Sequence, residues 1–248
     1  MSYLYKSEIT NYEDFSSGRV LYNQQGATAF PVRLANEIFM QCTDILIKNG
    51  NQGPYTIYDP LCGGAYTLTT LGILHGSEIG KLSASDIEDK VVELARKNLS
   101  LLTEAGLTAR EEQLKKMLDE YGKESHREAL VSLNNIRNIL KHTSHPIETQ
   151  CFINDIIKPD YGLLNDKVDM VISDLPYGEV VDWVKEESEE QTIEKLLENL
   201  LPILKKDSVV ALTSRKKTKI KHESYQCADH FVIGKRQTVI LKPIKSKN

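Results

Sequence analysis

The chain has 248 residues, of which 40% are hydrophobic, and a formal net charge of −4. This length and composition allow one sizeable core, so we expect a single domain over residues 1–248. No window reaches the roughly 18 uncharged apolar residues of a membrane helix, and the N-terminal residues lack the apolar region of a signal peptide. We therefore expect a soluble, cytoplasmic protein without a membrane partner.

The four cysteines, Cys42, Cys62, Cys151 and Cys227, lie far apart and include no C-x-x-C pair. This spacing argues against a disulfide framework and a structural zinc site, so we predict reduced, buried thiols and no metal centre. The charges are uneven, because residues 205–248 carry 12 Lys or Arg and three acids. That region is either a face for a polyanion or a hairpin that lysines keep soluble, and charge alone does not choose between them.

The first predicted element is a helix in an N-terminal extension over residues 1–50. Pro31 stands where a helix can begin, and apolar residues recur along one face after it. Beyond it, short apolar runs alternate with stretches of helical periodicity, of which the clearest are Glu88–Leu102 and Thr192–Leu204. The predicted strands are Tyr55–Asp59, Lys81–Asp86, Cys151–Asp155, Val168–Asp174, Ser208–Ser214, and two closely spaced runs at 230–234 and 238–242.

This alternation predicts an α/β fold, with a parallel sheet covered by helices on both faces and closed by an antiparallel hairpin of the last two strands. Residues 103–147 contain no predicted strand. They show two charged helical stretches broken near Tyr121 and Gly122, so we expect a two-helix insertion between the second and third strands.

The stretch Y-D-P-L-C-G-G-A-Y has the order of a nucleotide-type cofactor loop: a strand, an acid, a glycine pair and then a helix. Gly63 and Gly64 allow a tight turn and a close approach of a ligand to the backbone, and the helix N-terminus offers unpaired N–H groups. The dinucleotide fingerprint G-x-G-x-x-G is absent, because Ala65 and Leu68 stand at its second and third glycine positions. NAD is therefore disfavoured.

Acidic residues stand where three of the predicted strands end. Asp59 ends the first strand, Asp86 ends the second, 23 positions after Gly63, and Asp155 ends the third. An acid after the second strand is where a nucleoside cofactor places its ribose hydroxyls. An aspartate there also often caps the following helix, and each residue alone fits either role.

The fourth strand ends at Asp174 and runs into the turn Leu175-Pro176-Tyr177-Gly178. If the strand order begins 3-2-1-4-5, the first and fourth strands are neighbours, and this turn faces the glycine loop across one cleft. Asp174 and the carbonyls of the turn can then accept hydrogen bonds from a planar base, on which Tyr177 can stack. The alternative is an ordinary turn, in which proline fixes φ and glycine supplies a positive φ.

These motifs resemble the S-adenosylmethionine-dependent methyltransferases with an (Asp/Asn)-Pro-Pro-Tyr signature, which act on nucleobase nitrogens. Six segments between about Gly18 and Lys242 narrow the resemblance to the avilamycin-resistance family of 23S ribosomal RNA methyltransferases. In chain order they are AFPVRLANEIF, YDPLCGGAYTLTTLGILH, ASDIEDKVVELARKNLSLL, AGLTARE, YGKES and SDLPYGE.

The resemblance implies a seven-stranded, Rossmann-like methyltransferase sheet, mostly parallel with its last strand antiparallel. It implies transfer of a methyl group from S-adenosyl-L-methionine to N1 of a guanine in 23S rRNA, and resistance to orthosomycin antibiotics. The implied cofactor contacts are Asp59, Cys62, Gly63, Gly64, Ala65, Asp86 at the ribose, Ile87 beside it, Asp155 at the adenine edge, and Arg33 at cofactor or RNA phosphate. The implied target-base residues are Asp174, Leu175, Pro176 and Tyr177, with Asp174 as acceptor of the N1 proton or as the group that orients the purine.

One position departs from the family. Its loop usually reads Cys-Gly-Ser-Gly, whereas here Ala65 follows Gly64, so a methyl group stands where glycine is expected. We expect Gly64 to absorb part of the resulting strain. The basic segment Ser214–His222 predicts docking of RNA phosphates, with 23S rRNA or the large ribosomal subunit as partner of a monomeric protein.

Two alternatives stay open at this point. The target can be an exocyclic amine, guanine N2 or adenine N6, in RNA or DNA. The chain can also be a non-catalytic RNA-binding protein that keeps a methyltransferase fold while its cofactor loop, with Ala65, has decayed.

Overall fold

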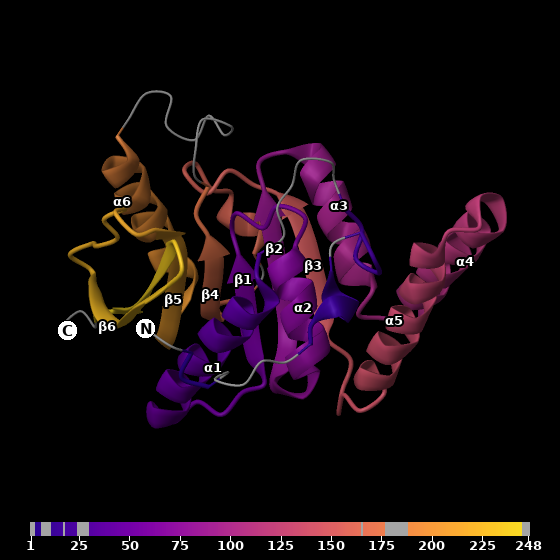
Figure 1. Ribbon diagram of the computed structural model, residues 1–248. Coiled ribbons are helices and arrows are strands. Elements are labelled where there is room, and N and C mark those ends of the chain that lie inside the picture. Colours follow the sequence, from indigo (N-terminus) through magenta and orange to yellow (C-terminus); the bar gives the residue numbers. More distant parts are fainter. Residues whose placement is uncertain are drawn as a thin grey trace.

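The structure is a computed structural model that describes residues 3–5, 11–16, 18–23, 30–164, 166–176 and 188–244. They form a seven-stranded sheet with helices on both faces (Figure 1). The strands are β1 Tyr55–Asp59, β2 Ile79–Asp86, β3 Glu148–Ile153, β4 Val168–Asp174, β5 Leu204–Arg215, β6 Tyr225–Ile233 and β7 Arg236–Pro243. The α-helices are α1 Val32–Lys48, α2 Tyr66–His75, α3 Asp89–Ser100, α4 Glu104–Tyr121, α5 Glu124–Leu140 and α6 Glu189–Leu200, and short 3-10 helices span Glu13–Phe15, Gly76–Glu78, Tyr161–Leu163 and Leu201–Ile203.

The strand order is β3-β2-β1-β4-β5-β7-β6. Strand β7 runs antiparallel to β5 and β6, and the other neighbouring pairs are parallel. The predicted fold class and the order that begins 3-2-1-4-5 are therefore confirmed. The chain builds outward from β1 to β3 and then returns to β4, so the order reverses between β1 and β4.

β1 and β4 have their predicted bounds, whereas β5 and β6 begin four and five residues earlier than predicted, and both ends of β3 differ from the prediction. This strand runs from Glu148 to Ile153 and stops two residues before Asp155, where the sequence predicted its end. It is the edge strand beside β2, and most of its side chains are at least partly exposed, so its first residues lack the apolar run of a central strand. The amide of Asn154 still bonds to the carbonyl of Asp86 at 3.1 Å, which carries Asp155 to the same edge of the sheet as Asp86.

Apolar side chains cover both faces of the central strands. On one face α1, α2 and α3 pack against the sheet around Ile57 of β1, and on the other α6 packs in the cluster that includes Tyr58 of β1. Adjacent residues of a strand point to opposite faces, so a strand covered on both sides needs an unbroken apolar run. This is why β1 and β4 could be recognised from the sequence.

The predicted reduced thiols are found, but not all of them are buried. The four cysteines are free, with Cys42 and Cys62 buried, Cys151 partly buried and Cys227 exposed. The prediction is wrong for Cys227 because it lies on the edge strand β6, whose residues 226–230 are exposed. Within the described ranges, no helix has the length and apolarity to cross a membrane, and no group of three His, Cys, Asp or Glu side chains could hold a metal ion.

A buried carboxylate fastens the amino edge of the sheet. Asp169 of β4 is 2% exposed, and it accepts hydrogen bonds from the Asn51 side chain at 2.7 Å and from the Thr56 amide at 2.8 Å. Lys205 of β5 pairs with it at 2.7 Å. A buried charge that is fully hydrogen-bonded is tolerated and is costly to uncover, so Asp169 fixes the starts of β1, β4 and β5 relative to one another.

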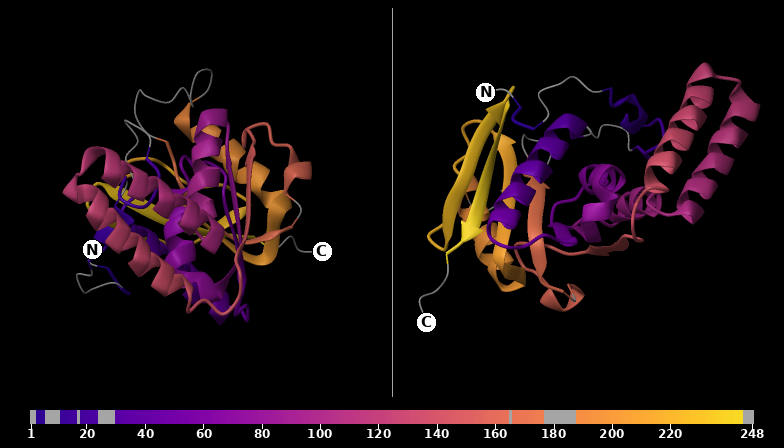
Figure 2. Two further views of the ribbon diagram at one scale, coloured as in Figure 1. Left: turned by 90° about the vertical axis from the view of Figure 1, so that its right-hand side faces the viewer. Right: turned by 90° about the horizontal axis from the view of Figure 1, so that it is seen from below.

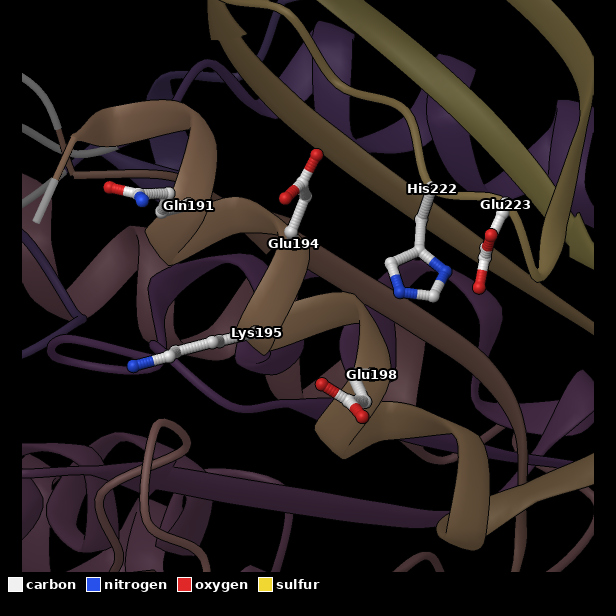
Figure 3. Close-up of a pocket in the computed structure, with 6 residues that line it drawn as sticks. All are labelled: Gln191, Glu194, Lys195, Glu198, His222 and Glu223. Carbon is white, nitrogen blue, oxygen red and sulfur yellow. The ribbon is translucent and has the colours of Figure 1, made fainter.

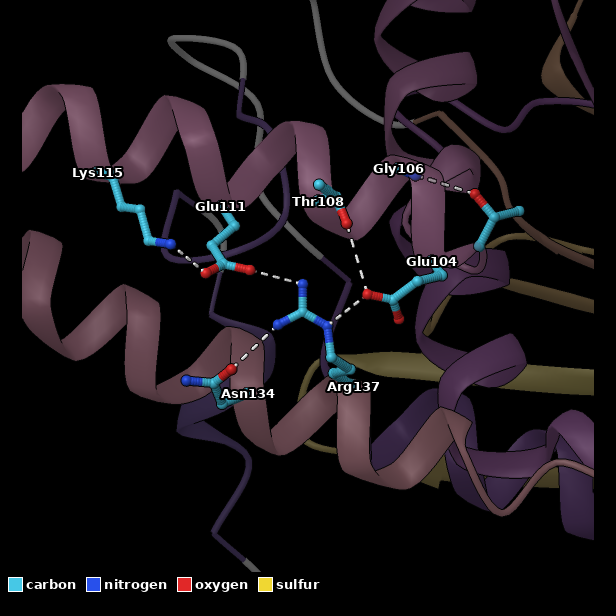
Figure 4. A network of polar contacts seen from close by, with 8 residues as sticks. Glu104, Gly106, Thr108, Glu111, Lys115, Asn134 and Arg137 are labelled. Atoms are coloured by element: carbon cyan, nitrogen blue, oxygen red, sulfur yellow. Dashed lines mark hydrogen bonds and ion pairs between the residues drawn. The ribbon is translucent and has the colours of Figure 1, made fainter.

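Helices α4 and α5 form the predicted two-helix insertion, which lies at the opposite end of the molecule from the β6–β7 hairpin (Figure 2). Gly122, with φ +60°, ends α4 in the left-handed conformation that glycine adopts readily. Arg137 of α5 then binds α4, donating to Glu104 at 2.9 Å and to Glu111 at 2.7 Å (Figure 4). The insertion is thus an ordered hairpin.

The junction of α3 and α4 depends on a glycine. Thr103 caps α4 by accepting from the Gly106 amide at 3.1 Å, while its hydroxyl donates to the carbonyl of Ser100 at 2.8 Å. A Cβ atom on Gly106 would lie 2.0 Å from that same carbonyl oxygen. The two helices therefore approach each other too closely at this point for any side chain.

We expect Gly106→Ala to lower the free energy of unfolding by about 1–3 kcal/mol, because the new methyl group clashes with backbone. This is the reverse of the gain of about 1 kcal/mol that replacing glycine by alanine usually gives inside a helix. Urea unfolding followed by circular dichroism measures the change. The matched control is Gly122→Ala, where the added Cβ meets open space and the cost is limited to the left-handed backbone, about 1–2 kcal/mol. A Gly106→Ala protein as stable as the wild type would contradict the close packing.

Candidate active site

The glycine loop after β1 and the turn after β4 meet at the carboxyl edge of the sheet. Strands β1 and β4 are parallel neighbours, with Ile57 opposite Met170 and Tyr58 opposite Val171. At their ends the Ser173 hydroxyl donates to the Asp59 carboxylate at 2.7 Å. This bond joins the two segments directly, so the residues after Asp59 and after Ser173 share one site.

Backbone contacts to β2 and α3 hold the glycine loop. The Cys62 amide donates to the Ser85 carbonyl at 2.9 Å, and the Gly63 amide donates to the Asp86 carboxylate at 3.0 Å. Asn98 of α3 donates to the Gly64 carbonyl at 2.8 Å. Gly63 has φ +51°, and a Cβ there would meet nothing within 4 Å, so the backbone at this turn is open to an approaching molecule.

Ala65, which directly precedes α2, has the left-handed backbone conformation, with φ 53° and ψ 30°. Among the described residues other than glycine, it is the one with a positive φ. Gly64 itself has no positive φ, so the left-handed conformations of this loop lie at Gly63 and Ala65. Gly64 is needed for another reason: a Cβ there would lie 2.8 Å from the Tyr66 ring and 3.0 Å from Leu94.

Three carboxylates stand at the carboxyl ends of β1, β2 and β4, on Asp59, Asp86 and Asp174. Asp59 is 3% exposed, and burial raises its pKa to about 7, although hydrogen bonds from Ser173 and the Leu61 amide act in the opposite direction. Burial also raises the pKa of Asp174 to about 6, against the opposing positive charge of Arg236. A neighbouring cation stabilises the ionised form of a buried carboxylate, so the site favours a positively charged ligand once these acids have lost their protons.

The turn after Asp174 is fixed as far as the described chain extends. The Leu175 amide donates to the Thr213 carbonyl of β5 at 2.8 Å, which continues the β4–β5 ladder by one residue. One oxygen of Asp174, Oδ1, is buried and has no hydrogen-bond partner among the described residues. An acceptor left in this state favours a ligand that carries a donor. Tyr177, the predicted stacking residue, lies outside the described residues.

The remaining predicted site residues, Ile87, Asp155 and Arg33, differ in their exposure and in the contacts that they make. Ile87, next to Asp86, is 66% exposed and presents an apolar side chain beside the acid. Asp155 accepts from the Ile157 amide at 2.9 Å, so its carboxylate also closes a local turn. The Arg33 guanidinium lies 3.9 Å from the centre of the Tyr3 ring, which ties it to the N-terminal segment.

One pocket among the described residues lies away from these strand ends. A cavity of about 410 Å³ lies between α6 and the segment before β6, lined by Gln191, Glu194, Lys195, Glu198, His222 and Glu223 (Figure 3). Three of its six lining side chains are carboxylates that repel phosphate, and none belongs to the glycine loop or the turn after β4. The carboxyl edge of β1 and β4 remains the candidate site.

A family model described as rRNA methyltransferase AviRa matches residues 1–236, which is nearly the whole chain. The chain belongs to the AviRa family. A relative from Streptomyces viridochromogenes, named 23S rRNA (guanine(2535)-N(1))-methyltransferase, is 34% identical over 244 residues, covering 97% of this chain and 96% of the relative. The family predicted from the sequence motifs is therefore confirmed.

Solved structures agree with this membership. That of the rRNA methyltransferase aviRa from Streptomyces viridochromogenes matches with a TM-score of 0.88 and 34% identity, over 97% of this chain and 96% of that one. TrmN from Thermus thermophilus matches with a TM-score of 0.51 and 14% identity, over 88% of this chain and 50% of that one. The second similarity extends to the fold alone.

Two residues of this AviRa-family site were missed from the sequence. Ser173, which bonds to Asp59, is a polar residue inside an otherwise apolar strand, and that contrast was an available signal. Asn98, which holds the Gly64 carbonyl, lies between Ala95 and Leu99 on the apolar side of α3. A polar side chain on a buried stripe needs a partner, so Asn98 also carried a readable signal.

The predicted basic segment after β5 is partly neutralised. Lys219 pairs with Glu190 of α6 at 2.7 Å, and the Thr218 hydroxyl donates to Glu189 at 3.3 Å. Lys216 and Lys217 are exposed, and Arg215 at the end of β5 lies opposite Arg236 at the start of β7. The β6–β7 turn, with Lys235 and Arg236, therefore lies beside the basic segment after β5, within the basic region 205–248 that the sequence indicated.

The energy of Ala65 is a balance of opposing contributions. A left-handed backbone costs alanine about 1–2 kcal/mol, whereas its methyl group is fully buried and contributes about 0.8 kcal/mol. Relative to glycine, alanine also restricts the unfolded chain, which favours folding by about 0.4–1 kcal/mol.

We therefore expect Ala65→Gly to change the free energy of unfolding by less than about 1 kcal/mol, because the contributions nearly cancel. Ala65→Val should lower it by more than about 2 kcal/mol, since a β-branched side chain is poorly tolerated at a positive φ and this position is fully buried. Chemical denaturation of both variants measures the difference. A stable Ala65→Val protein would show that the loop does not need this backbone conformation.

Proposed function

We propose that this chain methylates N1 of a guanine in 23S rRNA, with S-adenosyl-L-methionine as methyl donor. The observation that carries the proposal is the hydrogen bond of 2.7 Å between Ser173 and Asp59, which puts an open glycine loop next to Asp174 in a chain of the AviRa family. The named activity of the relative with 34% identity over nearly the full chain supports the same substrate.

The residues at the glycine loop fit this cofactor. The buried Asp59, in its ionised form, favours a neighbouring cation, and the open backbone at Gly63 leaves room for the methionine part. Asp86 follows β2, where a ribose acceptor is expected, the exposed Ile87 offers an apolar contact to adenine, and Asp155 is proposed to lie at the edge of the adenine ring. When bound, S-adenosylmethionine supplies an electrophilic methyl group on a positively charged sulfur.

Asp174 matches the hydrogen-bonding edge of guanine better than that of adenine. An ionised aspartate only accepts hydrogen bonds, and guanine presents two donors side by side, N1–H and the N2 amine, whereas adenine N1 is itself an acceptor. With a pKa of about 6, Asp174 is mostly ionised at neutral pH. Its buried Oδ1, which has no partner among the described residues, would receive such a donor.

Positioning is the main contribution of the protein to this reaction. As the bond from the methyl carbon to N1 forms and the carbon–sulfur bond breaks, the N1 proton passes to Asp174 or to water that Asp174 orients. The carbonyls of Leu175 and Pro176 and the ring of Tyr177 are proposed to hold the base. Because N1 is hidden in a base pair, the guanine must be unpaired or turned out of its helix.

The basic surface of Arg215, Lys216, Lys217, Lys235 and Arg236 is proposed to dock the RNA. These residues lie on two chain reversals at the same end of the β5–β7 pair, the end at which β4 leads into Asp174. Basic side chains beside a base-accepting site suit the phosphates that flank a target nucleotide. We infer that resistance to orthosomycin antibiotics is the consequence of this methylation.

The alternative of a non-catalytic RNA-binding protein rested on Ala65. Its energetic cost is nearly cancelled, and the loop keeps its bonds to Asp86 and Asn98, so Ala65 gives no reason to infer a decayed site. Methylation at the exocyclic amine of guanine is distinguished from methylation at N1 by the following experiment.

Reverse transcription across 23S rRNA tests the product, because a methyl group at N1 blocks base pairing and stops the polymerase, whereas a single methyl group at N2 largely does not. We expect a stop in rRNA from cells that express the wild type and none with Asp174→Ala, which loses the acceptor for N1–H. Calorimetry should show that Asp174→Ala still binds S-adenosylmethionine. Asp119→Ala, at an exposed aspartate of α4, is the control and should keep the stop. A stop of full strength with Asp174→Ala would contradict the role of Asp174.

Cofactor affinity should rise with pH. The raised pKa of about 7 means that Asp59 is largely protonated at pH 6 and ionised at pH 8, and only the ionised form attracts a cation. One group with this pKa gives on the order of a tenfold fall in Kd between these pH values, with release of a proton on binding. Calorimetry in buffers of different ionisation enthalpy measures both. In Asp59→Asn the pH dependence of the Kd for S-adenosylmethionine should vanish, and the affinity should fall. If this variant keeps the wild-type pH dependence, Asp59 is not the group that causes it.

A further inference from the structure

Residues 18–23, called the strap below, lie between the insertion and the glycine loop. The strap precedes α1, and its Val20 and Leu21 are 0% and 1% exposed. Both pack in the cluster that contains Tyr66 of α2 and apolar residues of α4 and α5. The strap is therefore a buried connection between two parts of the chain that do not follow each other in sequence.

On its inner side the strap is bonded to the glycine loop. Asn98 is 0% exposed and uses its side chain fully: it accepts from the Tyr22 amide at 2.8 Å and donates to the Tyr22 carbonyl at 3.1 Å and to the Gly64 carbonyl at 2.8 Å. The Tyr66 hydroxyl, one residue after Ala65, donates to the same Tyr22 carbonyl at 2.8 Å. Asn98 therefore bonds to both the strap and the glycine loop, and Tyr66, the residue that follows the loop, also bonds to the strap.

On its outer side the strap is held by the insertion. Arg110 of α4 is 5% exposed, and its guanidinium donates to the carbonyls of Val20 at 2.8 Å and Arg19 at 3.3 Å while lying 4.4 Å from the centre of the Tyr22 ring. Arg19 in turn pairs with Glu128 of α5 at 2.7 Å. A rigid guanidinium with several directed donors fixes the backbone that it contacts more closely than a flexible amine does.

We propose that Arg110 and Asn98 are positioning residues for cofactor binding, and that the insertion acts through the strap to hold the glycine loop in its left-handed turn. The inference rests on the proposed function, because it assumes that this loop binds S-adenosylmethionine. The bonds themselves carry the inference, since Asn98 holds the Gly64 carbonyl directly before the left-handed Ala65 and also bonds to Tyr22 of the strap. The insertion is then part of the cofactor site and not only an addition to the fold.

The test compares two arginines of the same insertion. Arg110→Gln removes the contacts to the strap, whereas the matched control Arg137→Gln removes bonds to Glu104 and Glu111 that join α4 to α5 and do not reach the strap. We expect Arg110→Gln to raise the Kd for S-adenosylmethionine about fivefold to tenfold, the effect of one or two ordinary hydrogen bonds, at an unchanged KM for RNA. Arg137→Gln should lower the melting temperature but leave that Kd at the wild-type value.

Tyr66→Phe provides a second variant that loses one hydroxyl and keeps the ring, so it remains informative if Arg110→Gln does not fold. It should raise the same Kd by about fivefold, as expected for one lost hydrogen bond. Equal effects of Arg110→Gln and Arg137→Gln, or wild-type affinity in both Arg110→Gln and Tyr66→Phe, would overturn the inference. A wild-type protein that fails to bind S-adenosylmethionine would overturn the proposed function, and the inference with it.

Discussion

The hydrogen bond from Ser173 to Asp59 is the contact on which the rest of the site depends. It closes the carboxyl ends of two parallel strands that come from distant parts of the chain, at the point where the strand order reverses. Asp59 is buried, and a buried carboxylate that loses its hydrogen-bond partner is destabilised. Separation of the two strand ends would break the Ser173–Asp59 bond and is therefore unfavourable. At the other edge of the sheet Asp169 fixes the starts of the same strands. Two buried acids therefore set the register of β1 and β4.

The site combines acidic residues in its interior with basic residues at its surface, and each set suits a different ligand. The carboxylates of Asp59 and Asp174 are buried, so solvent screens them little and they act on a ligand that contacts them, such as a cation or a base donor. The basic residues Arg215, Lys216, Lys217 and Lys235 are exposed, where their summed charge can attract a polyanion. A negative interior and a positive rim at one edge of the sheet are compatible with the proposed pairing of a cationic cofactor and an RNA substrate in a chain with net charge −4.

Features with a local signal could be predicted from the sequence, and features that depend on distant contacts could not. β1 and β4 are apolar runs ended by an acid, and the break between α4 and α5 is marked by Gly122, so all three were located correctly. β3 was misplaced because an edge strand lacks the apolar pattern of a central one. The apolar stripe around Asn98 indicates that this side chain needs a partner, but its partners lie 76 and 34 residues away, and no spacing in the sequence identifies them.

Ala65 shows what a glycine in a family pattern stands for. The turn before α2 requires a left-handed backbone, and here a small residue meets that requirement because its methyl group enters the core. This position therefore requires left-handed φ and ψ angles and a side chain small enough for the buried space. Both requirements together determine which residues can occupy it. Searches that insist on glycine at this place will pass over intact enzymes, whereas a pattern that admits any residue small enough for the space and tolerant of the turn will retain them.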